Sequence, residues 1–257
     1  MEINTNLKKI LKAVKDHDIS PDEAMVQINA GFSLEVGKIA SLDRFRRTRC
    51  GIPEVILAEG KDPDHLFSIA TSSVMSTGRC IITRVSPEFM LIIHKWADEN
   101  GINVVWSNEG RVLILGRDPL PDKTGGIVGI ISAGTSDIRV GEEARMIAEE
   151  MGCQVLTAYD VGVAGLHRLF PVLSEMDGCH AYVVAAGREG TLPSVIAGLV
   201  DRPVIGVPVS TGYGYMGKGQ AALASMLQSC SVLTVVNIDA GFVAGAYAAM
   251  IANLVVA

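Results

Sequence analysis

The stretch Ile127-Val128-Gly129-Ile130-Ile131-Ser132-Ala133-Gly134-Thr135-Ser136-Asp137 joins an apolar run to a polar loop that contains a glycine. Further apolar runs follow at 154–158, 181–185, 203–207 and 232–236, each separated from the next by a segment of helix length. Short apolar strands joined by such long connections are typical of βαβ crossovers, which align strands in parallel. The sequence therefore predicts an α/β fold with a doubly wound, five-stranded parallel sheet of the flavodoxin-like type in residues 125–257.

The composition agrees with this fold class. Hydrophobic residues make up 49% of the chain and aromatic residues only 5%. The interior must therefore be packed mainly by Val, Ile, Leu and Ala, which is typical of buried parallel strands and closely packed helices. This composition favours an α/β protein over a β-sandwich.

Charge and cysteine content exclude several classes of partner. A net charge of −6 would repel a phosphate backbone, so we expect no nucleic-acid partner. The cysteines are scattered and form no C-x-x-C pair, which argues against a disulfide framework or a thiolate zinc site; they are Cys50, Cys80, Cys153, Cys179 and Cys230. The first fifteen residues have no apolar core of the kind found in a secretory signal. We expect a cytoplasmic protein with reduced thiols.

The uncharged stretch at 240–257 is the one candidate for a membrane span. It is rich in Ala and Gly and contains Asn253, so a helix buried in a core or in a subunit interface is the favoured interpretation. We expect no membrane partner.

Residues 1–120 are predicted to form a smaller α/β domain that begins with two helices. Ser20 is the expected N-cap of the second helix, with Pro21 at its first position and Glu23 completing a capping box. Strands are expected at 55–58, 80–83, 103–105 and 112–115, and helices at 62–73 and 87–99. Turn-forming residues fill 118–126, so the domain boundary is expected there.

Polar side chains follow the first two strands of the parallel sheet, at the edge where such sheets bind ligands. Gly134, Thr135, Ser136 and Asp137 form a loop that opens a helix, which suits a phosphate, although Ser136 or Asp137 could simply cap that helix. Asp160 follows the second strand and could bind a ribose hydroxyl or a metal ion, or cap the next helix. These residues are therefore candidates for substrate binding, with Asp160 also a candidate metal ligand.

The loops after the third and fourth strands carry further candidates. Gly187 and Gly190 would let the backbone approach a ligand, and Arg188 and Glu189 between them offer a phosphate clamp and a proton acceptor, or else a surface ion pair. The fourth loop contains a G-x-G-x-x-G pattern at Gly212, Gly214 and Gly217. In a dinucleotide-binding fingerprint the first glycine lies at the turn from the first strand into the next helix. Here the pattern follows the fourth strand, and Pro208 and three more residues precede its first glycine. We interpret it as a flexible lid with Lys218 at the start of the next helix.

Cys230 lies before the last strand, at the sheet edge opposite these loops. A free cysteine in such a position is most often an inert, small apolar residue. If Cys230 and Glu189 belong to one site, a neighbouring subunit is needed to bring them together. None of the five histidines falls in a loop at the carboxyl edge, so triad and zincin chemistry are not expected.

Several segments resemble the PurE class of aminoimidazole ribonucleotide carboxylases over roughly 125–257: Gly134-Thr135-Ser136-Asp137, Ala185-Ala186-Gly187 and Pro203-Val204-Ile205-Gly206-Val207-Pro208-Val209. Where that class has a catalytic Ala-His-Arg, this chain has Ala158-Tyr159-Asp160, so purine turnover is not expected. A second resemblance, to the LarB family of nickel-pincer cofactor biosynthesis carboxylases, covers nearly the whole chain. It includes Arg49-Cys50-Gly51-Ile52-Pro53-Glu54 and Thr83-Arg84-Val85-Ser86-Pro87-Glu88.

The LarB resemblance implies an activity and a set of roles. Nicotinic acid adenine dinucleotide would be carboxylated at C5 of its pyridinium ring and hydrolysed to pyridinium-3,5-biscarboxylic acid mononucleotide and AMP. Cys230 matches the family's nucleophilic thiol and Glu189 its acidic base. The resemblance also implies CO₂ as co-substrate and a homo-octamer with its active site at a subunit interface. The phosphoanhydride chemistry suggests Mg²⁺, and no organic cofactor is expected.

Two alternatives stay open. One is an aminoimidazole ribonucleotide carboxylase or mutase of purine biosynthesis. The other is a non-catalytic module that senses a dinucleotide.

Overall fold

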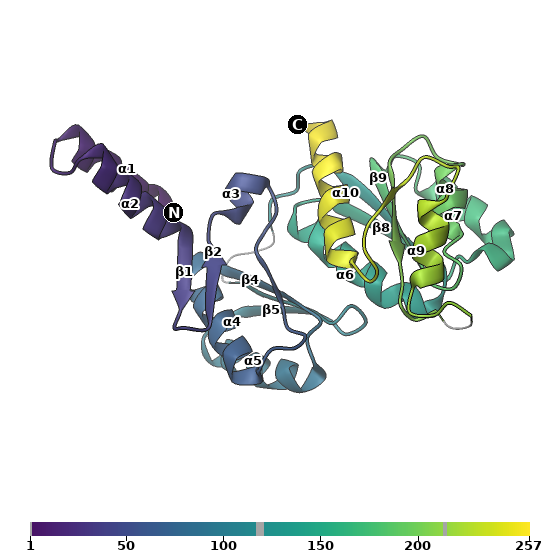
Figure 1. Ribbon diagram of the computed structural model, residues 1–257, viewed down its shortest axis with the longest axis horizontal. Coiled ribbons are helices and arrows are strands. Elements are labelled where there is room, and N and C mark those ends of the chain that lie inside the picture. The colour runs from purple at the N-terminus through teal and green to yellow at the C-terminus, as the bar shows by residue number, and fades with distance from the viewer. Residues whose placement is uncertain (1, 117–120, 213–214) are drawn as a thin grey trace.

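The computed structural model describes residues 2–116, 121–212 and 215–257 (Figure 1). Its C-terminal part contains a five-stranded sheet, and its N-terminal part contains a four-stranded sheet and a two-stranded hairpin. The predicted α/β class, with a parallel sheet and a smaller N-terminal domain, is confirmed. Residues 118–120, the first three of the predicted domain boundary, lie outside the described residues.

The C-terminal sheet has the flavodoxin-like strand order β11-β10-β9-β7-β8, and all its neighbouring strands are parallel. Its strands are β7 (Ile127–Ser132), β8 (Gln154–Ala158), β9 (Ala181–Ala186), β10 (Val204–Pro208) and β11 (Thr234–Val235). The last strand is shorter than the predicted run at 232–236, because this edge strand pairs with β10 over two residues only. The chain leaves β7 toward β8 on one side and later enters β9 on the other, which opens a crevice at the carboxyl ends of these strands.

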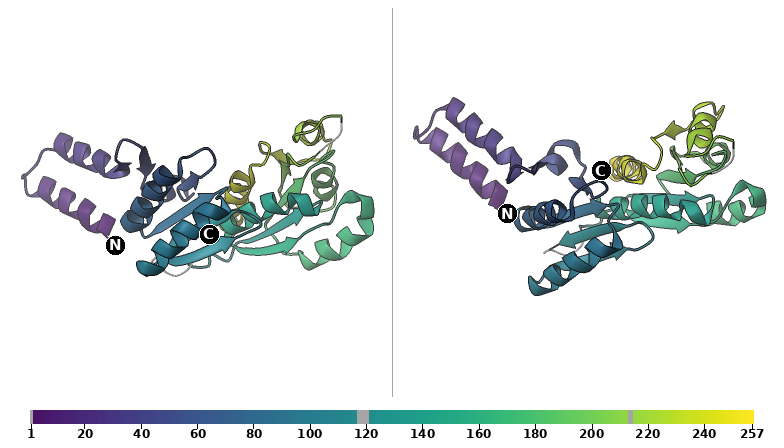
Figure 2. Two further views of the ribbon diagram at one scale, coloured as in Figure 1. Left: turned by 90° about the horizontal axis from the view of Figure 1, so that it is seen from below. Right: turned by 60° about the horizontal axis from the view of Figure 1, so that its bottom comes forward.

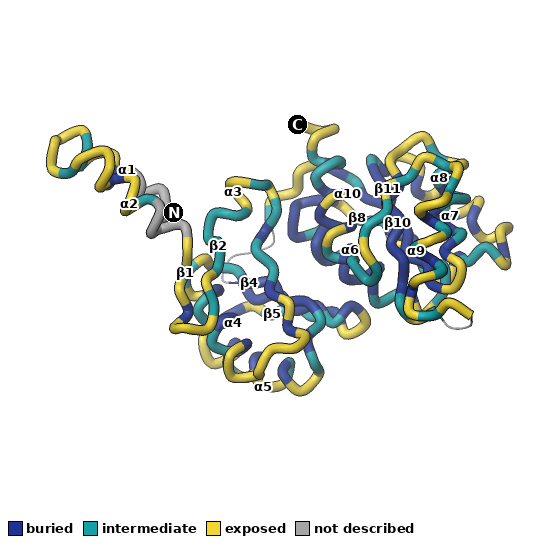
Figure 3. Tube along the Cα trace, in the orientation of Figure 1, coloured by how far each residue is buried: buried dark blue, intermediate teal, exposed yellow. Residues whose placement is uncertain are grey.

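Helices cover both faces of this sheet. Alternate side chains along the strands point to opposite faces, as Val183 and Val184 do on β9. One face packs against α6 (Ile138–Glu150) and α10 (Gly241–Val256), and the other against α7 (Leu169–Glu175), α8 (Leu192–Ala197) and α9 (Gln220–Leu227). Figure 3 shows burial continuing from the strands into α6 and α10.

The N-terminal part begins with α1 (Glu2–Lys15) and α2 (Pro21–Phe32), which lie side by side and project from the rest of the molecule (Figure 2). The capping box predicted at Ser20 is present: the Ser20 hydroxyl accepts the Glu23 N–H, and the Glu23 carboxylate accepts the Ser20 N–H. The hairpin of β1 (Ser33–Val36) and β2 (Ala40–Asp43), and the short helix α3 (Arg46–Cys50), were not predicted. A strand of four residues and one helical turn are too short to show a clear hydrophobic period.

The four-stranded sheet has the order β3-β4-β6-β5 and carries two capped helices. Its elements are β3 (Val55–Leu57), α4 (Pro63–Thr77), β4 (Arg79–Thr83), α5 (Pro87–Glu99), β5 (Asn103–Ser107) and β6 (Val112–Gly116). The Asp62 carboxylate caps α4, and the Ser86 hydroxyl caps α5. Each predicted strand and helix of this domain is therefore present, within a few residues of its expected bounds.

Helix α6 lies between the two sheets. Ile81 and Ile114 of the N-terminal sheet belong to the same buried cluster as Met146 of α6 and the strands of the C-terminal sheet. Because both sides of α6 are covered, three of its acidic side chains are buried: Glu142, Glu143 and Glu150 are 9%, 6% and 2% exposed. Such carboxylates need polar partners from the domain that covers them.

The N-terminal domain supplies those partners. The guanidinium of Arg79 on β4 donates to both oxygens of Glu150, each at 2.5 Å, and the Ser107 hydroxyl donates to Glu142 at 2.8 Å. Within the C-terminal part, Arg145 donates two further hydrogen bonds to Glu142. Burial alone would raise the pKa of Glu142. The hydrogen bonds that its carboxylate accepts from Arg145, Tyr159 and Ser107 outweigh burial and lower this pKa to about 2. The domains are thus joined through buried ionic contacts.

The uncharged C-terminal stretch forms α10, which packs against α6 as a core helix. Gly241 and Gly245 let the two backbones approach closely: a Cβ at Gly245 would lie 2.3 Å from the Ala144 carbonyl oxygen. Among the described residues, no helix is long and apolar enough to cross a membrane.

Candidate functional site

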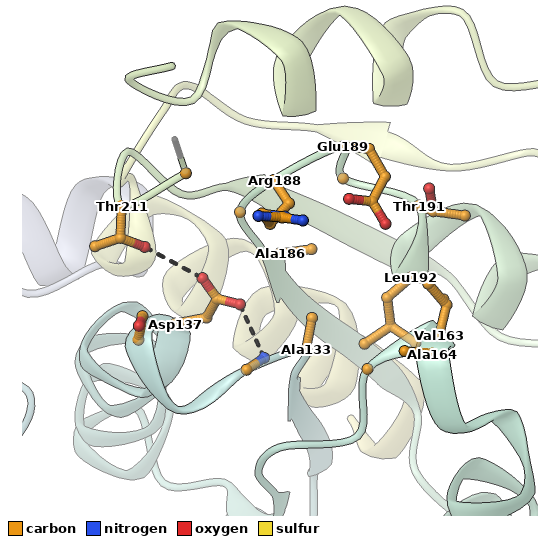
Figure 4. A pocket seen from close by; sticks show the side chains of 16 residues that line it. Ala133, Asp137, Val163, Ala164, Ala186, Arg188, Glu189, Thr191, Leu192 and Thr211 are labelled. Carbon is orange, nitrogen blue, oxygen red and sulfur yellow. Dashed lines mark hydrogen bonds between the residues drawn. The ribbon is translucent and has the colours of Figure 1, made fainter. Parts of the chain in front are cut away.

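A pocket of about 310 Å³ opens at the carboxyl edge of the parallel sheet, between the loops that follow β7, β8, β9 and β10 (Figure 4). Many of the predicted site residues line it: Gly134, Ser136, Asp137, Gly187, Arg188, Glu189, Gly190 and Gly212. Its position agrees with the general rule that open parallel sheets bind ligands where the strand order reverses.

Asp137 lies at the base of the pocket. Its carboxylate accepts the Gly134 N–H at 2.9 Å and faces the Thr211 hydroxyl at 3.5 Å (Figure 4). Burial raises the pKa of Asp137, and hydrogen bonds from Gly134, Gly187 and Thr211 oppose that shift. The carboxylate therefore links the loops after β7, β9 and β10 and shapes the pocket.

The loop after β9 forms the upper wall of the pocket. Gly190 has a φ of +64°, and a Cβ there would lie 2.7 Å from the Ala222 backbone, so only glycine fits. Arg188 also has a positive φ, 44°, a strained conformation that bulky residues adopt rarely and that is found preferentially at functional sites. The next residue, Glu189, is exposed, and its carboxylate points into the pocket in Figure 4.

The opposite wall is apolar. Val163 and Ala164 come from the segment after β8, and Leu192 from the start of α8. These residues and Thr211 were not predicted as site residues, because small and apolar side chains carry no chemical motif. Their position in the segments that follow β8, β9 and β10 is the signal that could have found them. An apolar wall facing a carboxylate suits a flat ring that undergoes proton transfer.

Other predicted residues lie outside the pocket lining. Asp160 has a φ of 60°, and its carbonyl and carboxylate oxygens accept from Arg168 at 2.8 and 3.4 Å. Thr135 is exposed beside the pocket, and the Lys218 N–H donates to the Gly212 carbonyl at 3.3 Å, behind the loop that lines it. Gly214 lies outside the described residues.

Cys230 is exposed and lies between α9 and β11, at the amino edge of the sheet. It is absent from the pocket lining, whose residues come from the opposite edge. Exposed apolar side chains flank it: Leu227 is 66% exposed and Val232 is 94% exposed. The chain by itself therefore does not bring Cys230 to Glu189.

A polar chain of contacts connects the N-terminal domain to the pocket. The Arg84 guanidinium, after β4, donates to the Asp239 carbonyl at 3.0 Å. The Asp239 carboxylate accepts the Ser210 N–H at 2.9 Å and the Ser210 hydroxyl at 2.5 Å. Because Ser210 directly precedes Thr211 and Gly212, which line the pocket, Arg84 supports one wall of the pocket from the other domain.

Tyr159 takes no part in the pocket. Its hydroxyl donates to Glu142 at 2.5 Å, which directs the side chain toward the domain interface. Among the described residues that line the pocket, none is a histidine. The side chain that follows β8 at this position therefore has a structural role.

The described residues contain no group of three or more His, Cys, Asp or Glu side chains that could bind a metal ion. Asp160, the predicted metal ligand, faces Arg168. We therefore assign no chemical step to a metal ion held by the protein alone.

Glu143 of α6 should make the stability of the protein depend on pH. Burial raises its pKa to about 7, although Arg84, Arg139 and the Phe242 N–H favour the carboxylate. In the unfolded chain its pKa is near 4.5. The folded state therefore binds more protons between these two pH values, so the contribution of Glu143 to stability is greatest below pH 4.5 and is lost as the pH rises through 7.

The variant Glu143→Gln should lack this pH dependence. Relative to wild type, its free energy of unfolding should rise between pH 5 and pH 8, by up to about 3 kcal/mol. Urea unfolding at both pH values measures the effect. Glu149→Gln, on the partly exposed side of the same helix, is the control and should follow wild type. A constant difference between Glu143→Gln and wild type would show that Glu143 does not titrate in this range.

Both parts of the chain are similar to known proteins. Residues 127–257 match the family model for AIR carboxylase, and residues 34–117 match the model for the LarB/PurE-like N-terminal domain. An uncharacterized protein of Methanocaldococcus jannaschii is 44% identical over 97% of this chain and 98% of its own length. An N5-carboxyaminoimidazole ribonucleotide mutase of Pyrococcus horikoshii is 34% identical over 33% of this chain and 49% of its own length. The corresponding mutase of M. jannaschii is 32% identical over 44% and 69%.

Proposed function

Because the chain belongs to the AIR carboxylase family and carries a LarB/PurE-like N-terminal domain, we propose that it carboxylates the pyridinium ring of nicotinic acid adenine dinucleotide. The matched domains support an enzyme with carboxylase or mutase chemistry of the PurE-like type. The products would be pyridinium-3,5-biscarboxylic acid mononucleotide and AMP. This reaction would be the first step of nickel-pincer cofactor biosynthesis.

The observation that carries the proposal is the pocket's combination of an exposed carboxylate, that of Glu189, with an apolar wall. None of the described residues that line the pocket is a histidine. Glu189 faces Val163, Ala164 and Leu192 across the space that a ring would occupy. Next to them, the glycine-containing loops after β7 and β9 line the pocket, and the guanidinium of Arg188 offers a positive charge to the phosphates of a dinucleotide.

The ring needs a nucleophile before it can react with CO₂. A pyridinium ring is electron-poor, so a thiolate must first add to C4, which makes C5 the nucleophilic carbon of an enamine. C5 then forms a bond to the carbon of CO₂, and C5 carries both a proton and the new carboxylate. We assign the thiolate to Cys230, the exposed cysteine of the chain.

The ring must then recover its aromaticity. Glu189 accepts the C5 proton, the ring nitrogen's electron pair expels the thiolate from C4, and the pyridinium ring is restored with its additional carboxylate. Separately, water adds to one phosphorus of the phosphoanhydride and the bridging P–O bond breaks, which releases AMP. Arg188, at the rim of the pocket, is positioned to neutralise charge on these phosphates. Any Mg²⁺ would be bound mainly by the substrate's own phosphates.

Cys230 reaches the ring in this proposal from a second copy of the chain. The exposed thiol is surrounded by exposed apolar side chains at the opposite edge of the sheet, as expected for a surface that is covered by a neighbouring subunit. A closed homo-oligomer, such as the predicted homo-octamer, would place this surface against the pocket of the next subunit.

One incubation tests the reaction. The purified protein is mixed with nicotinic acid adenine dinucleotide, ¹³C-bicarbonate and Mg²⁺, and the products are identified by mass spectrometry. We expect AMP and a mononucleotide that carries one labelled carboxyl group. Failure of both products to form, with the dinucleotide recovered intact, would rule out the proposal. Binding of the dinucleotide without turnover would instead favour a sensing module.

The mutase relatives raise a second candidate, a carboxylase or mutase acting on aminoimidazole ribonucleotide. Incubation of the protein with that ribonucleotide and CO₂, or with its N5-carboxylated form, separates the two candidates. We expect no turnover, because Tyr159 occupies the position of the histidine of the PurE class and is held by Glu142.

A further inference from the structure

A second cavity, of about 250 Å³, lies between the N-terminal domain and the C-terminal end of α6, away from the pocket at the sheet edge. It is enclosed by the β1–β2 hairpin, the segment around α3, helix α4 and the C-terminal end of α6. Glu150, the last residue of α6, lines this cavity, whereas Asp137, directly before α6, lines the first pocket. The two sites are thus about 20 Å apart along one helix of 13 residues.

The acidic side chains of this cavity are all neutralised by neighbouring arginines. Three carboxylates line it, and each forms an ion pair: Asp43 with Arg49, Glu54 with Arg46 and Glu150 with Arg79. They therefore leave no net negative charge to attract a cation.

Two arginines that line the cavity have no such partner. Arg44 and Arg47 form no ion pair or side-chain hydrogen bond with any described residue. The Arg44 Nε is buried without an acceptor, and it is the one side-chain atom in this condition among the described residues. A buried donor of this kind costs free energy unless something accepts its hydrogen bond. The cavity thus carries about two uncompensated positive charges in a protein whose net charge is −6.

The remaining lining specifies the kind of anion. Hydroxyl groups of Thr48 and Ser73 add polar positions, and Leu34, Leu42 and Pro53 provide an apolar surface. Guanidinium groups bind phosphate through paired hydrogen bonds, more readily than ammonium groups do. A ligand with a phosphate at one end and an apolar or planar body at the other would satisfy both parts.

We infer that this cavity is a second binding site, which takes a phosphate monoester that carries a planar ring, such as a nucleoside monophosphate. Arg44 and Arg47 bind the phosphate, and the apolar side chains of the hairpin contact the rest of the ligand. The Arg79–Glu150 ion pair, which joins the domains, forms one wall of this site. The inference does not depend on the reaction proposed for the first pocket.

The test uses AMP, inorganic phosphate and uncharged adenosine as probes, with affinity measured by calorimetry on the full chain. The double variant Arg44→Gln/Arg47→Gln should weaken AMP binding at this site on the order of 100-fold, because two charge-assisted hydrogen-bonding groups are lost. The control Lys61→Gln/Lys95→Gln removes the same charge from exposed positions and should bind like wild type. Phosphate should bind weakly, and adenosine should not bind at this site.

Arginine modification by phenylglyoxal, read by peptide mass spectrometry, separates this site from the first pocket. Saturating AMP should protect Arg44 and Arg47 in the wild-type protein, whereas Arg188 reports on the pocket at the sheet edge. The inference is overturned if AMP leaves Arg44 and Arg47 unprotected, or if the double variant binds AMP like its control. Neither AMP affinity nor arginine protection depends on carboxylation. A negative result here therefore does not bear on the proposed reaction, which the incubation with nicotinic acid adenine dinucleotide tests separately.

Discussion

Replacing Cys230 by alanine is expected to reduce carboxylation about 1,000-fold or more, because without the thiolate C5 of the ring never becomes nucleophilic. The fold should be unchanged, since Cys230 is exposed and contributes little packing. Binding of the dinucleotide, measured by calorimetry, should be retained. Cys50→Ala, a partly buried cysteine in the N-terminal domain, is the control and should keep wild-type activity. Full activity of Cys230→Ala would refute the thiolate mechanism.

Mixing two inactive variants tests whether the site is shared between subunits. Glu189→Gln should also lose carboxylation, because Asp137, the other carboxylate among the described residues that line the pocket, is buried and already accepts the Gly134 N–H. If Cys230 and Glu189 act from different subunits, oligomers formed by unfolding and refolding an equal mixture of Cys230→Ala and Glu189→Gln should regain about one quarter of wild-type activity. Oligomers that contain both variants and stay inactive would show that the two groups do not meet across an interface.

A side chain added at the contact between α6 and α10 is expected to destabilise the protein strongly. In Gly245→Ala the new methyl group would overlap the Ala144 carbonyl oxygen at 2.3 Å and its Cα at 2.7 Å, so the two helices must separate. The gain in helix propensity is about 1 kcal/mol, whereas overpacking of a rigid backbone contact costs more. We expect a net loss of about 2 kcal/mol or more in the free energy of unfolding.

Urea unfolding of Gly245→Ala measures this loss. The matched control is Gly198→Ala at the end of α8, where a Cβ would meet its nearest atom at an ordinary 3.5 Å and φ is negative. The control should change stability by less than about 1 kcal/mol. Equal stability of the two variants would mean that α10 can shift on α6 without cost.

The sequence predicted the five-stranded parallel sheet and the edge where the pocket lies. These features follow from local patterns: apolar runs of strand length, helix-length connections and polar loops at strand ends. The loop around Glu189 was found for the same reason. Its glycines and charged residues directly follow a buried strand, β9.

Other features depend on contacts between distant segments, which no local pattern reveals. The burial of Glu142, Glu143 and Glu150 follows from a second sheet that covers α6, and nothing within 138–150 indicates it. Asp160 was predicted to bind substrate or metal; it has a left-handed backbone conformation, its oxygens accept from Arg168, and it is not among the described residues that line the pocket. The direction in which a side chain points after a strand depends on the φ angle of its residue, which the sequence pattern does not reveal.

The position of α6 between two sheets has a consequence for the chain as a whole. Without residues 1–120, one flank of α6 would face water with the apolar side chain of Met146 uncovered, and Glu150 would lose the guanidinium of Arg79. The same helix begins directly after Asp137, so its disturbance would reach the base of the pocket. We therefore expect the two parts of the chain to unfold together, not as independent domains.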